Sequence, residues 1–224
     1  MKKNKSAEKA KKQPKAKKAE VSQWTTNPLN ETVLDYHYYE MTKSEKILYF
    51  VAAFLIGGVV SQFFYGGLFQ EDGVPTMLTY ISNAAAFVVV GLVAGRVFLP
   101  VRSRQLAEKR RDTLRREFRD MLESLTASLA ANSTVRDAFN TAYTDMCMQY
   151  SDDALISKEL DQFRRAGQIN VTLDVMMDDF AKRSGVEEIQ DFNNVFQVCY
   201  GPGGNMSRVI NQTHDIICER MEVE

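Results

Sequence analysis

The side chains able to do chemistry are few in this chain and lie far apart. His37 and His214 are its two histidines, and their separation leaves a histidine-based metal centre or catalytic triad with little material. Cys147, Cys199 and Cys218 show no Cys-x-x-Cys spacing, so reduced, buried thiols are expected. We therefore predict a protein without enzymatic activity, bound cofactor or metal site.

A glycine-rich segment near the end of the chain is the other candidate for chemistry. Gly201-Pro202-Gly203-Gly204-Asn205 precedes a helical pattern and could in principle hold an anion on its backbone amides. It lacks the Gly-Lys-Ser/Thr sequence of a nucleotide-binding loop. A tight interhelical turn at Gly203 and Gly204, with Asn205 capping the last helix, is the better interpretation.

Two apolar stretches, 47–69 and 77–99, dominate the first half of the chain. Each exceeds the ~20 residues that a membrane-spanning helix needs. Loop 66–76 between them carries acidic residues and no Lys or Arg, whereas both outer flanks are rich in basic residues. The positive-inside rule then predicts a hairpin with both termini in the cytoplasm.

The basic flanks indicate a partner as well as an orientation. The lysines between Lys2 and Lys18 and the arginines between Arg102 and Arg119 suit the anionic lipids of a cytoplasmic leaflet. Because the membrane already explains these charges, we expect no nucleic-acid binding. The residues after 119 are net acidic and numerous enough to form a core of their own.

Local signals predict where the first helices begin and how they pack. Thr42 and Glu45 have capping-box spacing just before the first apolar stretch, so the first helix should begin there. Gly91 and Gly95 form a small-xxx-small pair, which brings two helices close together in lipid. Packing against the first span and self-association of two chains are both open at this point.

Apolar residues recur at three- and four-residue steps from Leu114 onward, so the second span should continue out of the membrane as an amphipathic helix. It should end near Asn132, and Thr134 with Asp137 indicates the next helix start. Further apolar stripes follow, the last between Met206 and Ile217.

These patterns together predict an all-α protein, because no strand signal interrupts them. The expected parts are a basic disordered tail and juxtamembrane linker (1–41), a two-helix transmembrane hairpin (42–100) and a cytoplasmic antiparallel bundle of about six helices (101–224).

Three segments of the predicted bundle carry a family resemblance. They are FRDMLESLTASLAANSTVRDAFNTAY, ISKELDQFRRAGQINVTLDVMMDDFAKRSGVEEIQDF and GPGGNMSRVINQTHDIICERM. The last is the most specific, with a Gly-Gly turn and a helix that ends in Glu219 and Arg220. Over residues 104–221 the chain resembles the type II secretion system F family, most closely the TadB-like platform proteins of Flp (tight adherence) pilus assembly.

The resemblance implies a non-catalytic platform in the bacterial inner membrane that couples a cytoplasmic secretion ATPase to the assembly or export of pilin subunits. Family members usually continue into two more spans, whereas this sequence stops at Glu224. A short variant, a truncated product and a second multi-span platform protein that supplies those spans are the three explanations. A homo-oligomer is also open, since symmetric assemblies are common.

Charged residues around the inferred turns are our candidates for partner docking: Arg164, Arg165, Asp178, Asp179, Lys182, Arg183, Glu187 and Glu188. Plain solvated charge is the competing interpretation, because exposed charges contribute little. The alternative function is a membrane-anchored scaffold or signalling protein with a cytoplasmic helical interaction domain.

Overall fold

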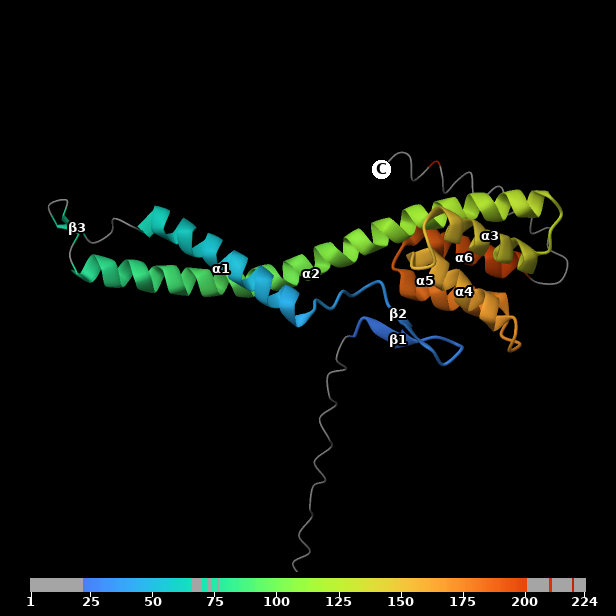
Figure 1. Cartoon of the computed structure of the whole chain (residues 1–224), viewed down its shortest axis with the longest axis horizontal. Coiled ribbons are helices and arrows are strands. Elements are labelled where there is room, and N and C mark those ends of the chain that lie inside the picture. The colour runs from blue at the N-terminus through green and yellow to red at the C-terminus, as the bar shows by residue number, and fades with distance from the viewer. Residues whose placement is uncertain are drawn as a thin grey trace, which may run out of the picture.

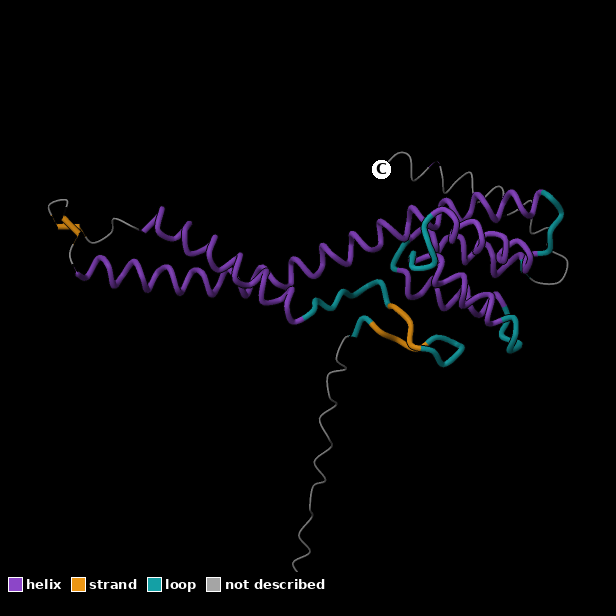
Figure 2. The backbone as a smooth tube through the Cα atoms, in the orientation of Figure 1, coloured by secondary structure: helices purple, strands orange, loops and turns teal. Residues whose placement is uncertain are grey.

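The computed structural model describes residues 22–65, 70–71, 74–75, 77–200, 210 and 219. Within these ranges the chain forms six helices and two short two-stranded ladders. The molecule is elongated, with a helical hairpin at one end and a helical bundle at the other (Figures 1 and 2). The predicted tail before residue 22 and the turn at Gly203, Gly204 and Asn205 lie outside the described residues.

Helix α1 (Lys43–Tyr65) begins where the capping box predicted. The Glu45 carboxylate accepts the Thr42 backbone N–H at 2.7 Å, and the Thr42 hydroxyl accepts the Glu45 N–H at 3.3 Å. Strands β3 (Gln70–Glu71) and β4 (Val74–Pro75) pair antiparallel between α1 and α2.

Helix α2 (Met77–Ala130) is continuous over 54 residues, which at 1.5 Å per residue makes it about 80 Å long. Its first part lies against α1, and its second part packs against α3, α4 and α6. It ends just before Asn132, which adopts the left-handed conformation with φ 61°. The predicted continuation of the second span into the bundle, and its end, are thus confirmed.

Glycines bring α1 and α2 into close contact. A Cβ atom on Gly91 would lie 2.7 Å from the Phe54 ring, and one on Gly95 would lie 2.6 Å from the Phe50 ring. The Gly91 and Gly95 pair therefore faces α1 of the same chain, as the first of the two alternatives for this motif expected.

The outer surface of the hairpin is apolar and exposed. The most apolar stretch of α1 is only 17% buried, and that of α2 is only 11% buried. The core helix of a soluble protein would be mostly buried. Phe63, Phe64 and Met77 are between 75% and 90% exposed. Both helices are long and apolar enough to be candidate membrane spans.

Four further helices complete the described bundle: α3 (Val135–Gln149), α4 (Leu155–Ala166), α5 (Leu173–Ser184) and α6 (Glu187–Cys199). Thr134 caps α3 by accepting the Asp137 N–H at 3.2 Å, as predicted. Gly185, with φ 60°, ends α5. Of the last predicted helix the structure describes only Ile210, which is buried in the core, and Glu219.

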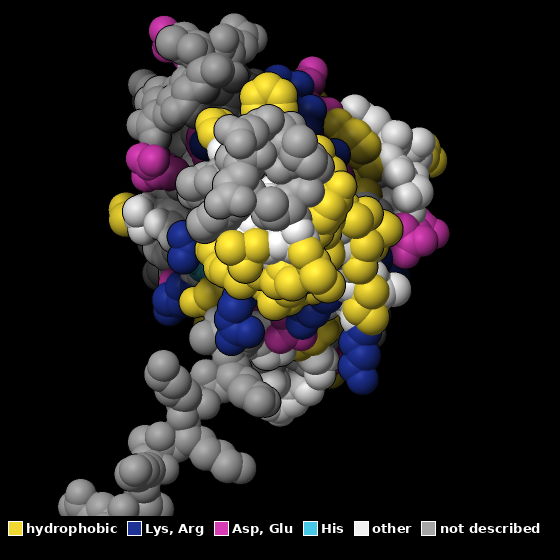
Figure 3. Space-filling view, turned by 90° about the vertical axis from the view of Figure 1, so that its left-hand side faces the viewer, with side chains coloured by type: hydrophobic (Ala, Val, Ile, Leu, Met, Phe, Trp, Pro, Cys, Tyr) yellow, Lys and Arg dark blue, Asp and Glu magenta, His cyan; other side chains and the backbone are white. Residues whose placement is uncertain are grey.

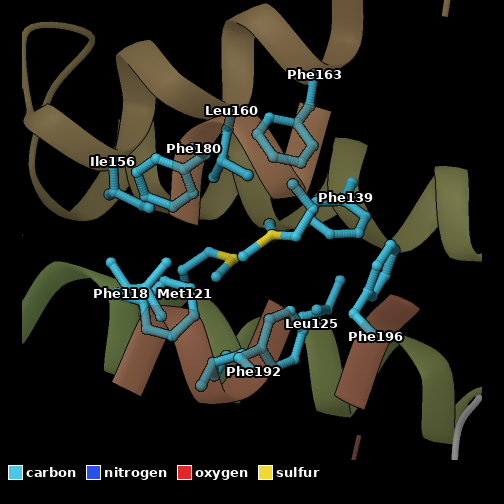
Figure 4. Close-up of a cluster of buried hydrophobic side chains, with 14 of the residues drawn as sticks. Phe118, Met121, Leu125, Phe139, Ile156, Leu160, Phe163, Phe180, Phe192 and Phe196 are labelled. Atoms are coloured by element: carbon cyan, nitrogen blue, oxygen red, sulfur yellow. The ribbon is translucent and has the colours of Figure 1, made fainter. Parts of the chain in front are cut away.

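Aromatic rings from α2, α3, α4, α5 and α6 meet in the core of the described bundle (Figure 4). Phe139 of α3 stacks on Phe163 of α4 with ring centroids 5.3 Å apart. Phe118 of α2 meets Phe192 of α6 edge to face at 5.6 Å. Burying such rings is the main source of stability for a domain of this size.

The segment before α1 corrects the sequence interpretation. Residues 22–41 were expected to be a linker in an all-α protein, but β1 (Trp24–Thr26) and β2 (Thr32–Leu34) pair antiparallel and lie beside α4 and α5. Strands of three residues are too short to show an alternating pattern, so tertiary contacts decide them. We call residues 22–41 the amino-terminal strap.

Candidate functional site

Arg183 of α5 lies at the centre of a buried polar network between the strap and the bundle. Its Nη atoms donate to the two carboxylate oxygens of Glu159 on α4 at 2.8 and 3.0 Å, and its Nε donates to Asp179 at 2.7 Å. Burial opposes the charge on Arg183, but the hydrogen bonds and negative charges of Glu159 and Asp179 outweigh it and raise the pKa. The guanidinium therefore stays charged and ties α5 to α4.

The strap enters this network through Tyr36, which is 1% exposed. Its phenol donates to the Glu159 carboxylate at 2.8 Å, and its backbone N–H donates to the Arg183 carbonyl at 2.9 Å. Arg183 in turn donates to the Leu34 carbonyl at 2.9 Å. Burial and the charge of Glu159 raise the pKa of Tyr36, so the phenol remains a donor.

A second contact joins the strap to α4 one turn further along. The Asn27 amide donates to Gln162 at 2.9 Å, and Gln162 donates to Glu159 at 3.2 Å. Both amides are buried, and this hydrogen bond satisfies the Asn27 donor and the Gln162 acceptor away from solvent. Nearer to solvent, Glu31 of the strap forms an ion pair with Arg165.

A cleft of about 510 Å³ opens between the strap and α4. Trp24, Tyr36 and Tyr143 contribute aromatic surface to it, and the ion pair of Glu31 with Arg165 borders it. Its described lining offers paired charges and hydrogen-bonding groups. These contacts hold the amino-terminal strap against α4 and α5. We call the buried polar contacts of Tyr36, Glu159, Gln162 and Arg183 the coupling network.

Two more buried carboxylates, those of Glu117 and Glu188, form contacts between α2 and the first turns of α4 and α6. Glu117, 6% exposed, accepts the Ile156 N–H at 2.9 Å in the first turn of α4, whose N-cap residue makes no side-chain capping bond. Burial raises the pKa of Glu117 against the opposing effect of these backbone hydrogen bonds. Glu188, at the start of α6, forms an ion pair with Arg115 at 3.0 Å. Helix α2 thus holds the first turns of both α4 and α6.

The charged residues predicted for docking occupy different environments. Arg183 and Glu188 are buried, and Asp179 is half-buried against Arg183. The other candidates are exposed or half-buried: Arg164, Arg165, Asp178, Lys182 and Glu187. Among these, Arg164 pairs with Asp161 at 2.6 Å and Lys182 with Asp178 at 2.5 Å. Docking by these residues stays a prediction.

Among the described residues, the histidine and cysteines considered for chemistry, His37, Cys147 and Cys199, do not gather into one site. His37 contacts Asp35 at 2.8 Å, and burial raises the pKa of the Cys147 thiol. Across the part of the chain that the structure describes, no three His, Cys, Asp or Glu side chains gather as a metal site. His214 and Cys218 fall outside that part.

In comparisons with protein-family models, curated proteins and solved structures, no match to this chain was found. The resemblance to the type II secretion F family therefore remains a prediction from the residues.

The sequence analysis did not single out the buried polar residues Glu117, Glu159 and Gln162. Glu159 and Gln162 sit at three-residue steps after Ile156, on the same face as the apolar stripe of α4, and Glu117 lies directly before Phe118. A charged or amide side chain on an apolar face was the available signal, because such groups are buried only when they are paired.

Proposed function

We propose that this protein is a non-catalytic platform component of a type II secretion or Flp (Tad) pilus assembly machine. It would lie in the bacterial inner membrane with both termini in the cytoplasm. The observation that supports this most is α2, one helix that is a candidate span and then contributes Leu114, Phe118 and Leu125 to the bundle core. In this proposal, the helix shared by the two parts would carry a displacement of one to the other.

The strap gives the bundle a second connection to the hairpin. Tyr36 is fastened to α4 and α5, and α1 begins at Lys43, only a few residues later. A secretion ATPase that moves α4 and α5 would therefore act on α2 directly and on α1 through the strap. In this proposal the hairpin is the surface that meets pilin subunits and a second multi-span platform protein.

Substituting Asp178 is the most specific test of ATPase docking. It pairs with the exposed Lys182, whereas its neighbour Asp179 supports the buried Arg183 and cannot be changed without disturbing the fold. We expect Asp178→Lys to weaken ATPase binding, measured on purified proteins. Glu123→Lys, an equivalent charge reversal at an exposed site on α2, is the matched control. Unchanged binding by Asp178→Lys removes this surface from the interface.

The function as a whole is tested by mild crosslinking in the native membrane, affinity purification of the tagged full chain, and mass spectrometry of its partners. Recovery of a secretion ATPase together with a multi-span platform protein is the expected result. Their reproducible absence, with the protein intact and abundant, contradicts the proposal and favours the scaffold or signalling function.

A further inference from the structure

We propose that a small cleft where the strap meets α2 binds the headgroup of an anionic phospholipid. This inference rests on the membrane insertion in the proposed function and names the lipid class and the residues involved. The cleft measures about 190 Å³ and is lined by His37, Tyr38, Tyr39, Glu40, Ser103, Arg104 and Ala107. At ~30 Å³ of liquid volume per water, it has room for about six water molecules.

The depth of the cleft matches the headgroup layer of a bilayer. Exposed apolar side chains on α2 continue through Phe98 and Val101, and Ser103 and Arg104 follow within one turn. At 1.5 Å per residue, Arg104 lies about 4.5 Å beyond Val101 along the helix axis. The polar layer on each side of the hydrocarbon is ~5–7 Å thick, so Arg104 falls within it.

The cleft offers a charge suited to a phosphate diester. Arg104 is exposed, and its side chain forms no hydrogen bond or ion pair with the residues that the structure describes. A guanidinium presents several N–H donors in a plane, which matches two phosphate oxygens at once.

The walls of the cleft are fixed before any ligand binds. The Ser103 hydroxyl donates to the Tyr39 carbonyl at 2.6 Å, and Arg110 lies over the Tyr39 ring at 4.5 Å. These contacts hold the strap against α2 on both sides of Arg104. A preformed site loses less conformational entropy on binding.

The charges around the cleft favour an anionic surface over a zwitterionic one. Seen from the hairpin end, Lys and Arg side chains border the apolar surface (Figure 3). Lys43 and Lys46 in the first turn of α1 and Arg104 in the cleft are exposed, and Glu40 in the cleft and Glu45 of α1 are the opposing charges. The three cations exceed the two carboxylates, so a net negative lipid is preferred.

Native mass spectrometry of the full chain in detergent, titrated with phosphatidylglycerol or phosphatidylcholine, tests the site. We expect the wild type to prefer phosphatidylglycerol, and Arg104→Gln to lower that affinity about tenfold, the effect of losing one charge-assisted hydrogen bond. Arg116→Gln is the matched control, because Arg116 is an exposed arginine on the same helix about 18 Å further from the hairpin.

Three outcomes overturn the inference: equal binding of the two lipids, an equal loss in both variants, or displacement of phosphatidylglycerol by inorganic phosphate, which would make this a free-phosphate site. Alkaline carbonate extraction of native membranes separates the two proposals. A protein released by carbonate overturns both this site and the proposed membrane function, whereas an inserted protein without lipid preference overturns the site alone.

Discussion

Arg183 and Glu159 form a two-point ion pair in the interior of the protein, with N to O distances of 2.8 and 3.0 Å and side chains only 5% and 3% exposed. The pair joins α5 to α4, and Glu159 also accepts the phenol of Tyr36 from the strap. Three parts of the chain therefore depend on one ion pair. Removing Arg183 leaves the buried Glu159 carboxylate without this counter-charge, which costs more than losing a surface pair.

The first prediction concerns this ion pair. Arg183→Met should lower the free energy of unfolding by about 3–5 kcal/mol, because Glu159 is left buried and charged. Urea unfolding of the full chain in detergent, followed by far-ultraviolet circular dichroism, measures it. Trp24, the sole tryptophan, lies on the strap, so its fluorescence reports separately whether the strap stays in place.

Lys182→Met is the matched control, since Lys182 is exposed one position earlier and should change stability by less than ~1 kcal/mol. Replacing Glu159 by Leu in the Arg183→Met background should restore part of the loss. Equal stability of the two single variants would refute a stabilising role for the buried pair.

The second prediction is that the folding stability depends on pH through Glu117. Burial raises the pKa of the Glu117 carboxyl above its ordinary value of 4.5, so the folded state binds this proton more tightly than the unfolded state does. The stability gained from the proton is complete below about pH 4.5 and is lost as the pH rises through the folded pKa.

Glu117→Gln keeps an acceptor for the Ile156 N–H and removes this titration. Its stability relative to the wild type should rise between acid and neutral pH, as measured by urea unfolding across that range. Glu123→Gln, the same substitution at an exposed position on the same helix, is the matched control. A relative stability of Glu117→Gln that falls with pH would contradict the raised pKa.

The third prediction concerns the hairpin. Gly95→Ala should destabilise the protein by about 1–3 kcal/mol, because the added Cβ would lie 2.6 Å from the Phe50 ring. Phe50→Ala in the same chain removes the obstacle, so the double variant should lose less than the sum of the two single changes. Thermal unfolding in detergent measures all three, and strict additivity would exclude this contact.

The fourth prediction concerns topology. In a chain whose three native cysteines are replaced by serine, Glu71→Cys should react with an impermeant maleimide on intact cells. Glu187→Cys should react only after the cells are permeabilised, because both flanks of the hairpin are basic. The reverse labelling pattern would overturn the predicted orientation.

Much of the helical architecture could be predicted from local sequence patterns, namely apolar length, helix periodicity and capping signals. Apolar length predicted the two long helices, and the steps from Leu114 onward predicted that the second continues into the bundle. Capping signals at Thr42 and Thr134 predicted helix starts within a residue of those observed. These features depend on residues close together in the chain, so no tertiary information is needed to see them.

The polar contacts were decided only by the tertiary structure. Arg183 was predicted as a surface docking residue, yet it is buried against Glu159, while Tyr36 and Asn27 come from a segment expected to be a linker. Tyr36 and Glu159 are 123 positions apart in the sequence. Helix periodicity reports which residues share a face, but it does not report which distant segment covers that face, because packing between elements decides burial and pairing.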